Sequence, residues 1–314
     1  MAILVLSLFI GRYPGLKVFS PALFLEDELA QRLVLNLRLP RLLSAMLLGM
    51  SISAAGAVFQ MIFGNPLVEP GFLGVSQGAA FGAALSILFL NSAAWFTQGS
   101  AVIFALLGLG FSYFLAHRVR FGGWVLRLVL SGIAVSALFS SGLGVLKYLA
   151  DPLSQLPEIT FWLLGGLSGA SWKELQSILP LVLFGLMVMY RMRWRLNLLS
   201  LEDEVASSLG VAVTRERTLL LVAAVAATAA VISISGMVTW VGLIIPHLAR
   251  RLFGTSGQFS IPAAMVMGGI FTVICDDLAR TLLAGEIPLG ILTSFIGALS
   301  FIALMVNRQI KVQR

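Results

Sequence analysis

Two acidic residues inside an apolar stretch near the carboxyl end of the chain are the first candidates for chemistry. Asp276 and Asp277 follow Cys275 in a run that is otherwise apolar. An ionisable side chain within a membrane-spanning segment marks a substrate, ion or proton pathway by default. Arg280 follows one helical turn later, at i+4 from Asp276 and i+3 from Asp277, and can pair with either acid. The pattern leaves two alternatives, a proton relay and a structural ion pair near the membrane face.

The groups that catalysis or cofactor binding would require are missing from the sequence. No lysine stands in a GK[ST] phosphate loop, so we expect that the chain does not hydrolyse ATP by itself. His117 and His247 are far apart and lack a histidine or carboxylate at metal-ligand spacing, which excludes HExxH-type metal chemistry. The single cysteine, Cys275, excludes a disulfide or redox pair within one chain. We therefore expect no enzymatic activity, no metal and no cofactor on this chain.

The composition identifies the solvent in which the chain must fold. Of the 314 residues, 59% are hydrophobic and 11% are charged, and the mean hydropathy is +0.98. So few charges cannot cover a water-soluble globule. The apolar residues recur in runs near the ~20 residues that a helix needs to cross a bilayer, without the ~10-residue alternation of membrane barrels. The fold class is therefore all-α, a polytopic membrane protein.

Ten segments are candidate membrane spans, and no linker separates them into domains. The first is interrupted by Pro14 and Gly15, and the run from 218 to 250 is too long for one crossing, so we divide it near Gly236. Ser/Pro-rich and low-complexity stretches are absent. We expect one transmembrane domain over residues 1–314, with spans at 1–19, 42–62, 71–90, 100–117, 126–149, 177–193, 218–235, 237–250, 261–280 and 288–306.

Lysine and arginine gather on one side of this ten-span arrangement. Positive residues are preferentially retained in cytoplasmic loops. In this topology 13 of the 21 basic residues share one side, which we assign to the cytoplasm together with both termini. The net charge of +7 therefore reflects membrane topology and gives no reason to expect nucleic-acid binding. The 13 residues are Arg118, Arg120, Arg127, Arg191, Arg193, Arg195, Arg215, Arg217, Arg250, Arg251, Arg308, Lys311 and Arg314.

Small residues mark places where helices approach each other closely. Gly49, Ser53 and Gly56 lie along one span, and Gly78 and Gly82 form a GxxxG pair on the next. Helices in lipid associate through close backbone packing. We expect these positions to form helix contacts rather than to line a pathway.

A series of local motifs extends along most of the chain. Residues 38–41 read Arg-Leu-Pro-Arg. A segment from Gly56 to Gln60 follows, and residues 65–70 then read Asn-Pro-Leu-Val-Glu-Pro. In the second half, residues 240–247 read Trp-Val-Gly-Leu-Ile-Ile-Pro-His. Asp276, Arg280, Glu286 and Gly290 follow. In this order, from about residue 38 to about residue 300, the motifs resemble the FecCD family of ABC importer permeases, which includes vitamin B12, haem and iron-siderophore permeases.

The resemblance implies a type II, vitamin B12-permease-like importer fold with about ten transmembrane helices per subunit. It implies a homodimer in the bacterial inner membrane, with two cytoplasmic ATPase subunits that hold ATP and Mg²⁺ and a periplasmic substrate-binding protein. The arginines that match the family's docking rim are Arg38, Arg41 and Arg280, whose guanidinium forks suit carboxylates of the binding protein. Interfacial anchoring is the alternative for Arg38 and Arg41, and the pair with Asp276 is the alternative for Arg280.

The resemblance also implies that a cytoplasmic loop, at about 195–217, couples the permease to the ATPase. Val205, Ala206 and Leu209 are expected on one helical face, with acids at the N-terminal end where the helix dipole favours them. The alternative is a surface helix in the headgroup zone. The residues expected to carry coupling are Glu202, Glu204, Ala206, Leu209, Gly210 and Val211.

Two departures from the family pattern bear on the gate and on one loop. Vitamin B12-type permeases carry small hydroxyl residues at the cytoplasmic gate where this chain has Val125 and Leu126, so we expect a gate that closes through apolar contact and dewetting. This departure weighs against vitamin B12 as the substrate. Residues 254–258 read Gly-Thr-Ser-Gly-Gln where many relatives carry Asp-His-Arg, which leaves the conformation of that loop open.

Two other classes of function have less support in the sequence than the importer. A proton- or sodium-coupled transporter needs buried ionisable relays, which Asp276 and Asp277 alone suggest. An intramembrane enzyme needs a nucleophile with a base or a metal cluster, and nothing qualifies. We expect a permease that translocates a metal chelate by alternating access, with molybdate or tungstate as the alternative cargo. Specificity is expected to lie with the binding protein, so the sequence does not choose among siderophore, haem, cobalamin-like chelate and oxyanion.

Overall fold

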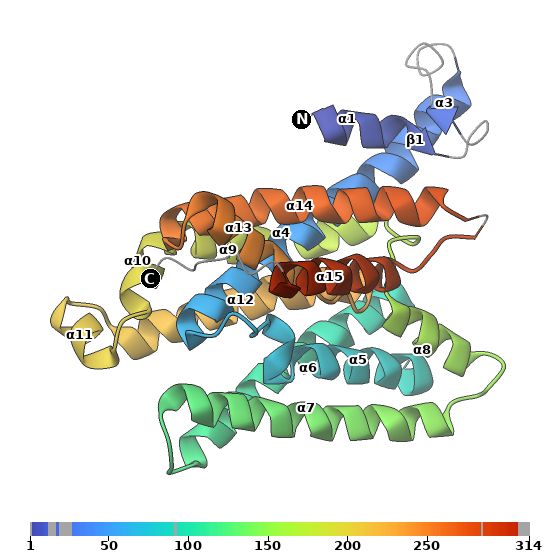
Figure 1. Ribbon diagram of the computed structural model, residues 1–314. Helices are drawn as coiled ribbons and strands as arrows, with labels where there is room; N and C mark the ends of the chain where they lie inside the picture. Colours follow the sequence, from blue (N-terminus) through green and yellow to red (C-terminus); the bar gives the residue numbers. More distant parts are fainter. Residues whose placement is uncertain (1, 12–16, 19–26, 91–92, 284, 307–314) are drawn as a thin grey trace.

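In the computed structural model, which describes residues 2–11, 17–18, 27–90, 93–283 and 285–306, long helices run side by side (Figure 1). Six are long and apolar enough to cross a membrane: the continuous α3–η1–α4 helix (Glu28–Leu33, Val34–Arg38, Leu39–Phe63), α6 (Ala94–Arg118), α7 (Trp124–Leu149), α9 (Trp172–Arg191), α12 (Val213–Ser235) and α14 (Gly257–Thr281). Shorter apolar helices are formed by α5 with η3 (Val75–Leu85, Ser86–Leu90) and by α15 (Leu289–Val306). The prediction of an all-α polytopic fold is confirmed.

The remaining elements lie at or near the ends of the bundle. In Figure 1 the left end carries α10 (Arg193–Leu199) and α11 (Asp203–Ser208), and the right end carries α8 (Gln155–Leu164). We name these the α11 end and the α8 end. The other short elements are η2 (Pro70–Leu73), α13 (Val241–Phe253), α1 (Ala2–Phe9) and the strands β1 (Ile10–Gly11) and β2 (Lys17–Val18).

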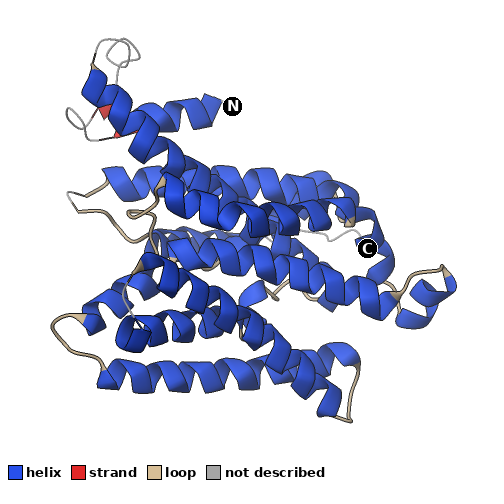
Figure 2. Ribbon diagram, turned by 180° about the vertical axis from the view of Figure 1, so that it is seen from behind, coloured by secondary structure: helices blue, strands red, loops and turns tan. Residues whose placement is uncertain are grey.

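The expected first span, 1–19, is wrong. Helix α1 ends at Phe9, and β1 then pairs antiparallel with β2, with Ile10 opposite Val18 (red in Figure 2). In the sequence Pro14 and Gly15 follow directly, and both residue types favour turns over helix. The other nine expected spans each correspond to a helix in the described part of the chain, of which α13, with 13 residues, is the shortest when α5 and η3 are taken as one helix.

Helix α12 lies at the centre of the bundle because it is apolar all round. Its residues 220–235 are almost all buried, and many of them are alanines, which let neighbouring helices approach closely. It packs against α4, α6 and α9. The chain then leaves the helix at Gly236, where φ is +65° and a Cβ atom would lie 2.1 Å from the carbonyl oxygen of Trp162. The predicted break between 218–235 and 237–250 is confirmed as the non-helical segment 236–240.

The most extensive helix contact joins α4 to α14, and at its centre backbone atoms approach each other closely. A Cβ atom on Gly49 would lie 2.0 Å from the carbonyl oxygen of Gly268, and one on Gly268 would lie 2.1 Å from Oγ of Ser53. Thr272 adds a hydrogen bond from its hydroxyl to the carbonyl of Ala45, at 2.6 Å. These contacts confirm the packing role predicted for Gly49 and Ser53. Because α4 and α14 touch over such a long seam, their polar residues near the α8 end are held in fixed relative positions.

Candidate functional site

Five charged residues meet at the α8 end and form what we call the charged cluster: Arg41, Asp276, Asp277, Arg280 and Glu286. The guanidinium of Arg41 donates to both carboxylate oxygens of Asp276 from Nε at 3.0 Å, and to Glu286 from Nη1 at 2.8 and 3.0 Å. Arg280 pairs through Nε with Asp276 at 3.3 Å and through Nη2 with Asp277. Three carboxylates therefore neutralise two guanidinium groups.

The charged cluster is buried except at Glu286. Side-chain exposure is 4% for Asp276, 11% for Arg41 and 12% for Arg280, but 46% for Glu286. Charges out of water are tolerated only when they are paired and hydrogen-bonded. The predicted pairing of Arg280 with Asp276 and Asp277 is confirmed, and Arg41 as a further partner of Asp276 was missed. With two guanidiniums already on Asp276, the geometry favours the structural ion pair over a proton relay.

The three arginines expected to dock a binding protein all lie at the α8 end, but in different settings. Arg41 and Arg280 are the buried cations of the charged cluster. Arg38 is half-buried and donates to the carbonyl oxygen of Leu8 in α1 at 3.0 Å, while Ser7 of the same helix donates to Asp277 at 2.7 Å. Helix α1 is therefore attached to the cluster by hydrogen bonds.

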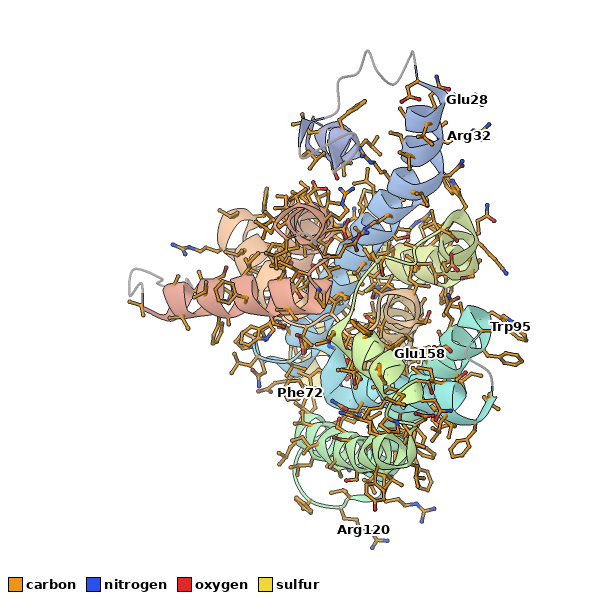
Figure 3. All side chains as sticks on the ribbon, turned by 90° about the vertical axis from the view of Figure 1, so that its right-hand side faces the viewer. Glu28, Arg32, Phe72, Trp95, Arg120 and Glu158 are labelled. Carbon is orange, nitrogen blue, oxygen red and sulfur yellow. The ribbon has the colours of Figure 1, made fainter. Side chains whose placement is uncertain are left out.

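A pocket of about 570 Å³ opens beside the charged cluster. Figure 3 views the bundle from the α8 end, with Glu158 of α8 near the middle of the view. Arg41, Glu158, Glu174 and Glu286 contribute its charged groups, and residues 233–236 at the end of α12 form part of its wall. Glu174 is engaged at the start of α9, where it accepts from the backbone N–H of Ser171 at 3.1 Å. In the described residues no three His, Cys, Asp or Glu side chains are placed to hold a metal ion.

The motif residues of the two halves of the chain meet a second time, between α4 and α13. A Cβ atom on Gly56 would lie 2.0 Å from the carbonyl oxygen of Gly242. One turn further, Gln60 donates to the carbonyls of Gly242 and Leu243 at 3.3 and 3.2 Å and accepts from Nη2 of Arg250 at 2.5 Å. Local spacing could not indicate these contacts, because about 180 residues separate the partners. The two motifs therefore form one packed contact.

The 65–70 motif forms the turn that leads from α4 back into the bundle. Helix α4 ends at Gly64 in the left-handed conformation, and Oδ1 of Asn65 accepts from the backbone N–H of Leu67 at 2.9 Å. Glu69 follows immediately before η2. Burial raises the pKa of its carboxyl above the ordinary value. Gly64 and Asn65 are therefore the residues that form the turn after α4.

The loop expected to couple to an ATPase stands out from the α11 end (left in Figure 1). The prediction that Val205, Ala206 and Leu209 share one face is wrong for Ala206, which is fully buried while Val205 and Leu209 are 46% and 57% exposed. Adjacent helical positions differ by about 100°, so Ala206 turns inward when its neighbour faces water. Glu202, Glu204 and Gly210 are exposed, Gly210 with φ +80°, and Val211 is buried. The loop exposes an apolar pair, Val205 and Leu209, beside the acids Glu202 and Glu204, and Leu201 is exposed as well.

The residues predicted to form the gate, Val125 and Leu126, occupy the first turn of α7, also at the α11 end. Leu126 is 47% exposed and Val125 is half-buried. The preceding Gly122 has φ +75°, and a Cβ atom there would lie 2.8 Å from Leu126. Val125 and Leu126 thus form an apolar pair at the α11 end of the bundle.

The loop at 254–258, which the sequence left open, is held by a side chain from another element. Oδ1 of Asn197 in α10 accepts from the N–H of Gly257 at 2.7 Å, and its Nδ2 donates to Oγ of Ser256 at 3.1 Å. Gly254 ends α13 with φ +88°. An Asp-His-Arg sequence is therefore not required to order the turn.

Comparison with known proteins agrees with this arrangement of motifs. The model of the FecCD transport family matches residues 1–307. The chain is 38% identical over 302 residues to the molybdate import system permease protein MolB of Haemophilus influenzae, covering 94% of this chain and 89% of that protein. It is 36% identical over 302 residues to the iron(3+)-hydroxamate import system permease protein FhuG of Bacillus subtilis, covering 93% and 88%.

A solved structure gives the same result in three dimensions. It represents an inward-facing conformation of a metal-chelate type ABC transporter, with a TM-score of 0.90, 36% identity, and coverage of 97% of this chain and 95% of the other. Family model, relatives and structure all extend over nearly the whole chain. The chain therefore belongs to the FecCD transport family and is a multi-pass permease subunit of an ABC importer.

Proposed function

We propose that this permease carries a metal chelate from the periplasm to the cytoplasm by alternating access, driven by separate ATPase subunits. The observation that supports this most directly is the likeness, along almost the full chain, to a metal-chelate type ABC transporter. Molybdate is the second candidate, because the molybdate permease of Haemophilus influenzae is 38% identical. No resident cofactor is needed on this chain, since ATP and Mg²⁺ are held by the ATPase.

The proposed orientation places the α11 end in the cytoplasm. Ten of the 13 basic residues assigned to that side are described, and all ten lie at the α11 end: Arg118, Arg120, Arg127, Arg191, Arg193, Arg195, Arg215, Arg217, Arg250 and Arg251. Arg308, Lys311 and Arg314 lie outside the described residues. An excess of positive charge on the cytoplasmic side is the general rule for membrane proteins. Cytoplasmic termini remain part of the proposal.

Two copies of the permease, two ATPase subunits and one periplasmic binding protein make up the proposed transporter. Helix α7 and helix α15 each expose a row of large apolar side chains, and Phe72, 40% exposed, lies near α7 in Figure 3. A second copy packed over this face would enclose the pathway. On the cytoplasmic side, Val205 and Leu209 are expected to enter a groove of the ATPase, with Glu202 and Glu204 against basic residues of its rim.

Docking of the binding protein is proposed at the α8 end, where Arg38, Arg41 and Arg280 lie. Arg41 and Arg280 already hold buried carboxylates, so a docking acid would have to join or displace Asp276 or Glu286. Arg38 is half-buried at the same end and donates to the carbonyl oxygen of Leu8. A carboxylate on each lobe of the binding protein can then engage one subunit of the dimer.

The experiment is ATP-dependent uptake into proteoliposomes that hold the permease with its ATPase and binding protein. Ferric siderophore, haem, cobalamin and molybdate are offered in turn. Uptake is repeated with Arg38→Glu and with the control Arg32→Glu, since Arg32 is an exposed cation six residues earlier that pairs with Glu28 (Figure 3). We expect uptake of one chelate that requires ATP and falls far more with Arg38→Glu than with Arg32→Glu.

Each other outcome rejects a defined part of the proposal. Uptake of molybdate alone would replace the chelate by the oxyanion. Equal effects of the two substitutions would remove Arg38 from the docking surface. Uptake driven by an ion gradient without ATP would reject the ABC mechanism for this chain.

A further inference from the structure

Arg217 occupies an unusual position at the α11 end, because its charge is buried beside the proposed ATPase contact. It lies one turn into α12, and its side chain is only 7% exposed. Its Nη2 donates to Oδ1 of Asp203 at 2.8 Å and its Nη1 to Oδ2 at 3.4 Å. Asp203 is the first residue of α11, the proposed coupling helix. A single bidentate ion pair thus connects α11 to α12.

The other partner of Arg217 is an aromatic ring of a third helix. Its Cζ lies 4.6 Å from the ring centroid of Trp124, within the range of a cation–π contact. Trp124 is the first residue of α7 and directly precedes the gate residues Val125 and Leu126. Nε of Arg217 has no hydrogen-bond partner in the described part of the chain. The carboxylate of Asp203 and the indole of Trp124 therefore hold this guanidinium.

Trp124 is also packed against neighbours that fix the start of α7. Its ring lies 5.9 Å from that of Phe63 at the end of α4 and 6.2 Å from that of Tyr113 in α6. The hydroxyl of Tyr113 lies 2.7 Å from Oγ1 of Thr218, the residue after Arg217. A shift of Arg217 would consequently be felt by the first turn of α7.

We propose that Arg217 is a positioning residue that transmits movement of α11 to the cytoplasmic gate through Asp203 and Trp124. This inference rests on the proposed function, in which the ATPase moves α11. Separation of Asp203 from Arg217 would break a charge-assisted bidentate pair and leave the guanidinium without a carboxylate, which is unfavourable. The ion pair therefore stays closed when α11 moves, and the guanidinium shifts against the indole ring. The first turn of α7, with Val125 and Leu126, is thereby held in one position or released.

The test measures solute transported per ATP hydrolysed in the complete transporter in proteoliposomes. Arg217→Met is compared with Arg215→Met, because Arg215 is an exposed arginine on the same turn with no partner within the described residues. We expect Arg217→Met to hydrolyse ATP but to lower transport per ATP about fivefold or more, and Arg215→Met to leave it unchanged. Trp124→Leu should lower it similarly, and Trp124→Phe less, because a ring remains to face the cation.

Two further variants keep the proposal testable if Arg217→Met does not fold. The exchange Asp203→Arg with Arg217→Asp restores an ion pair with reversed polarity, so it should fold but should lose the cation at Trp124 and remain uncoupled. Trp124→Phe preserves packing and probes the ring contact alone. Normal transport per ATP in the exchange variant or in Trp124→Leu would overturn the relay, as would equal ratios for Arg217→Met and Arg215→Met.

Failure of the proposed function gives a different result. Substitution of the exposed apolar pair of α11 and its C-cap, Val205→Glu with Leu209→Glu, should abolish co-purification of the ATPase. If the ATPase still binds that variant, α11 is not the coupling contact. If the ATPase is lost but Arg217→Met transports normally, the coupling contact stands and the relay alone is rejected.

Discussion

At the α8 end, Arg41 and Arg280 share three carboxylates, whereas at the α11 end Arg217 has one carboxylate and the face of an indole ring. All three guanidiniums are buried to a similar degree, with side-chain exposures between 7% and 12%. The difference lies in their partners. Removal of any one acid from the charged cluster leaves another in place, but removal of Asp203 leaves Arg217 with none.

The partners also belong to elements of different kinds. Asp276 and Asp277 project from α14, a 25-residue helix packed backbone to backbone on α4. Asp203 projects from α11, a six-residue helix that stands out from the bundle. The side chain of Asp203 is 61% exposed. The same residue type can therefore fix one end of the protein and leave the other free to respond to a partner.

The largest effect is expected from Asp276→Asn. The substitution leaves Arg41 and Arg280 close together in a buried site with one carboxylate each, and loss of one member of a buried ion pair costs about 3–5 kcal/mol. The measurement is the free energy of unfolding of the purified permease in SDS titrations. If Asp276→Asn lowered the free energy of unfolding by less than the loss of an exposed ion pair does, the charges would not hold the α8 end together.

A matched control for this prediction is the exposed pair at the tip of α3. Glu28 bonds Arg32 at 2.6 Å, with side chains 79% and 69% exposed. An exposed i, i+4 pair contributes about 0.3–0.5 kcal/mol. Glu28→Gln should therefore be nearly silent in the same titration.

Gly49→Ala should have the next largest effect, because it tests the seam that holds the charged cluster. The added methyl would lie 2.0 Å from the carbonyl of Gly268, so α4 and α14 must separate. Extra volume in a packed contact costs about 1–3 kcal/mol. Gly110→Ala in α6 is the control, since nothing lies within 4 Å of a Cβ atom there. If both alanine variants unfold at the wild-type SDS fraction, the close seam does not contribute to stability.

Much of the fold could be predicted from the sequence, because a membrane span is recognised from one local property, a run of about 20 mostly apolar residues. Nine expected spans match helices, and the failure at 1–19 follows from a run that turns back after Phe9. The pair of Arg280 with Asp276 is a contact within one helix and was predicted from spacing. The pair of Arg41 with Asp276 crosses 235 residues, so spacing carries no sign of it.

The coupling region shows why short elements resist prediction. Helix α11 has six residues, too few to establish a helical period, and the inward turn of Ala206 could not be separated from the exposed positions beside it. Arg217 was interpreted as one of several basic residues on the cytoplasmic side. Its burial beside Trp124 depends on the path of α7, which no motif near Arg217 indicates.

A smaller effect is expected from Glu286→Gln at the rim of the charged cluster. Glu286 is 46% exposed, and Arg41 keeps its bonds to Asp276 when this acid is neutralised. A hydrogen bond to a charged group contributes about 1.5–3 kcal/mol when buried, and exposure brings this near 1 kcal/mol or less. The SDS titration should rank Glu286→Gln well below Asp276→Asn. The reverse order would contradict the assignment of Asp276 as the central anion.

Of the acids that pair with the buried arginines, Asp203 is expected to show the smallest change in stability on substitution by asparagine, although Asp203→Asn should disturb coupling. The side chain of Asp203 is mostly exposed, asparagine keeps an acceptor for Arg217, and the indole of Trp124 remains. We expect the free energy of unfolding to change by at most about 1 kcal/mol, while transport per ATP falls relative to Glu204→Gln, a neutralised acid one residue later. A destabilisation as large as that of Asp276→Asn would show that both ends anchor their arginines alike. Since Arg217 has no second carboxylate, a loss confined to coupling is the outcome that separates a movable ion pair from a static one.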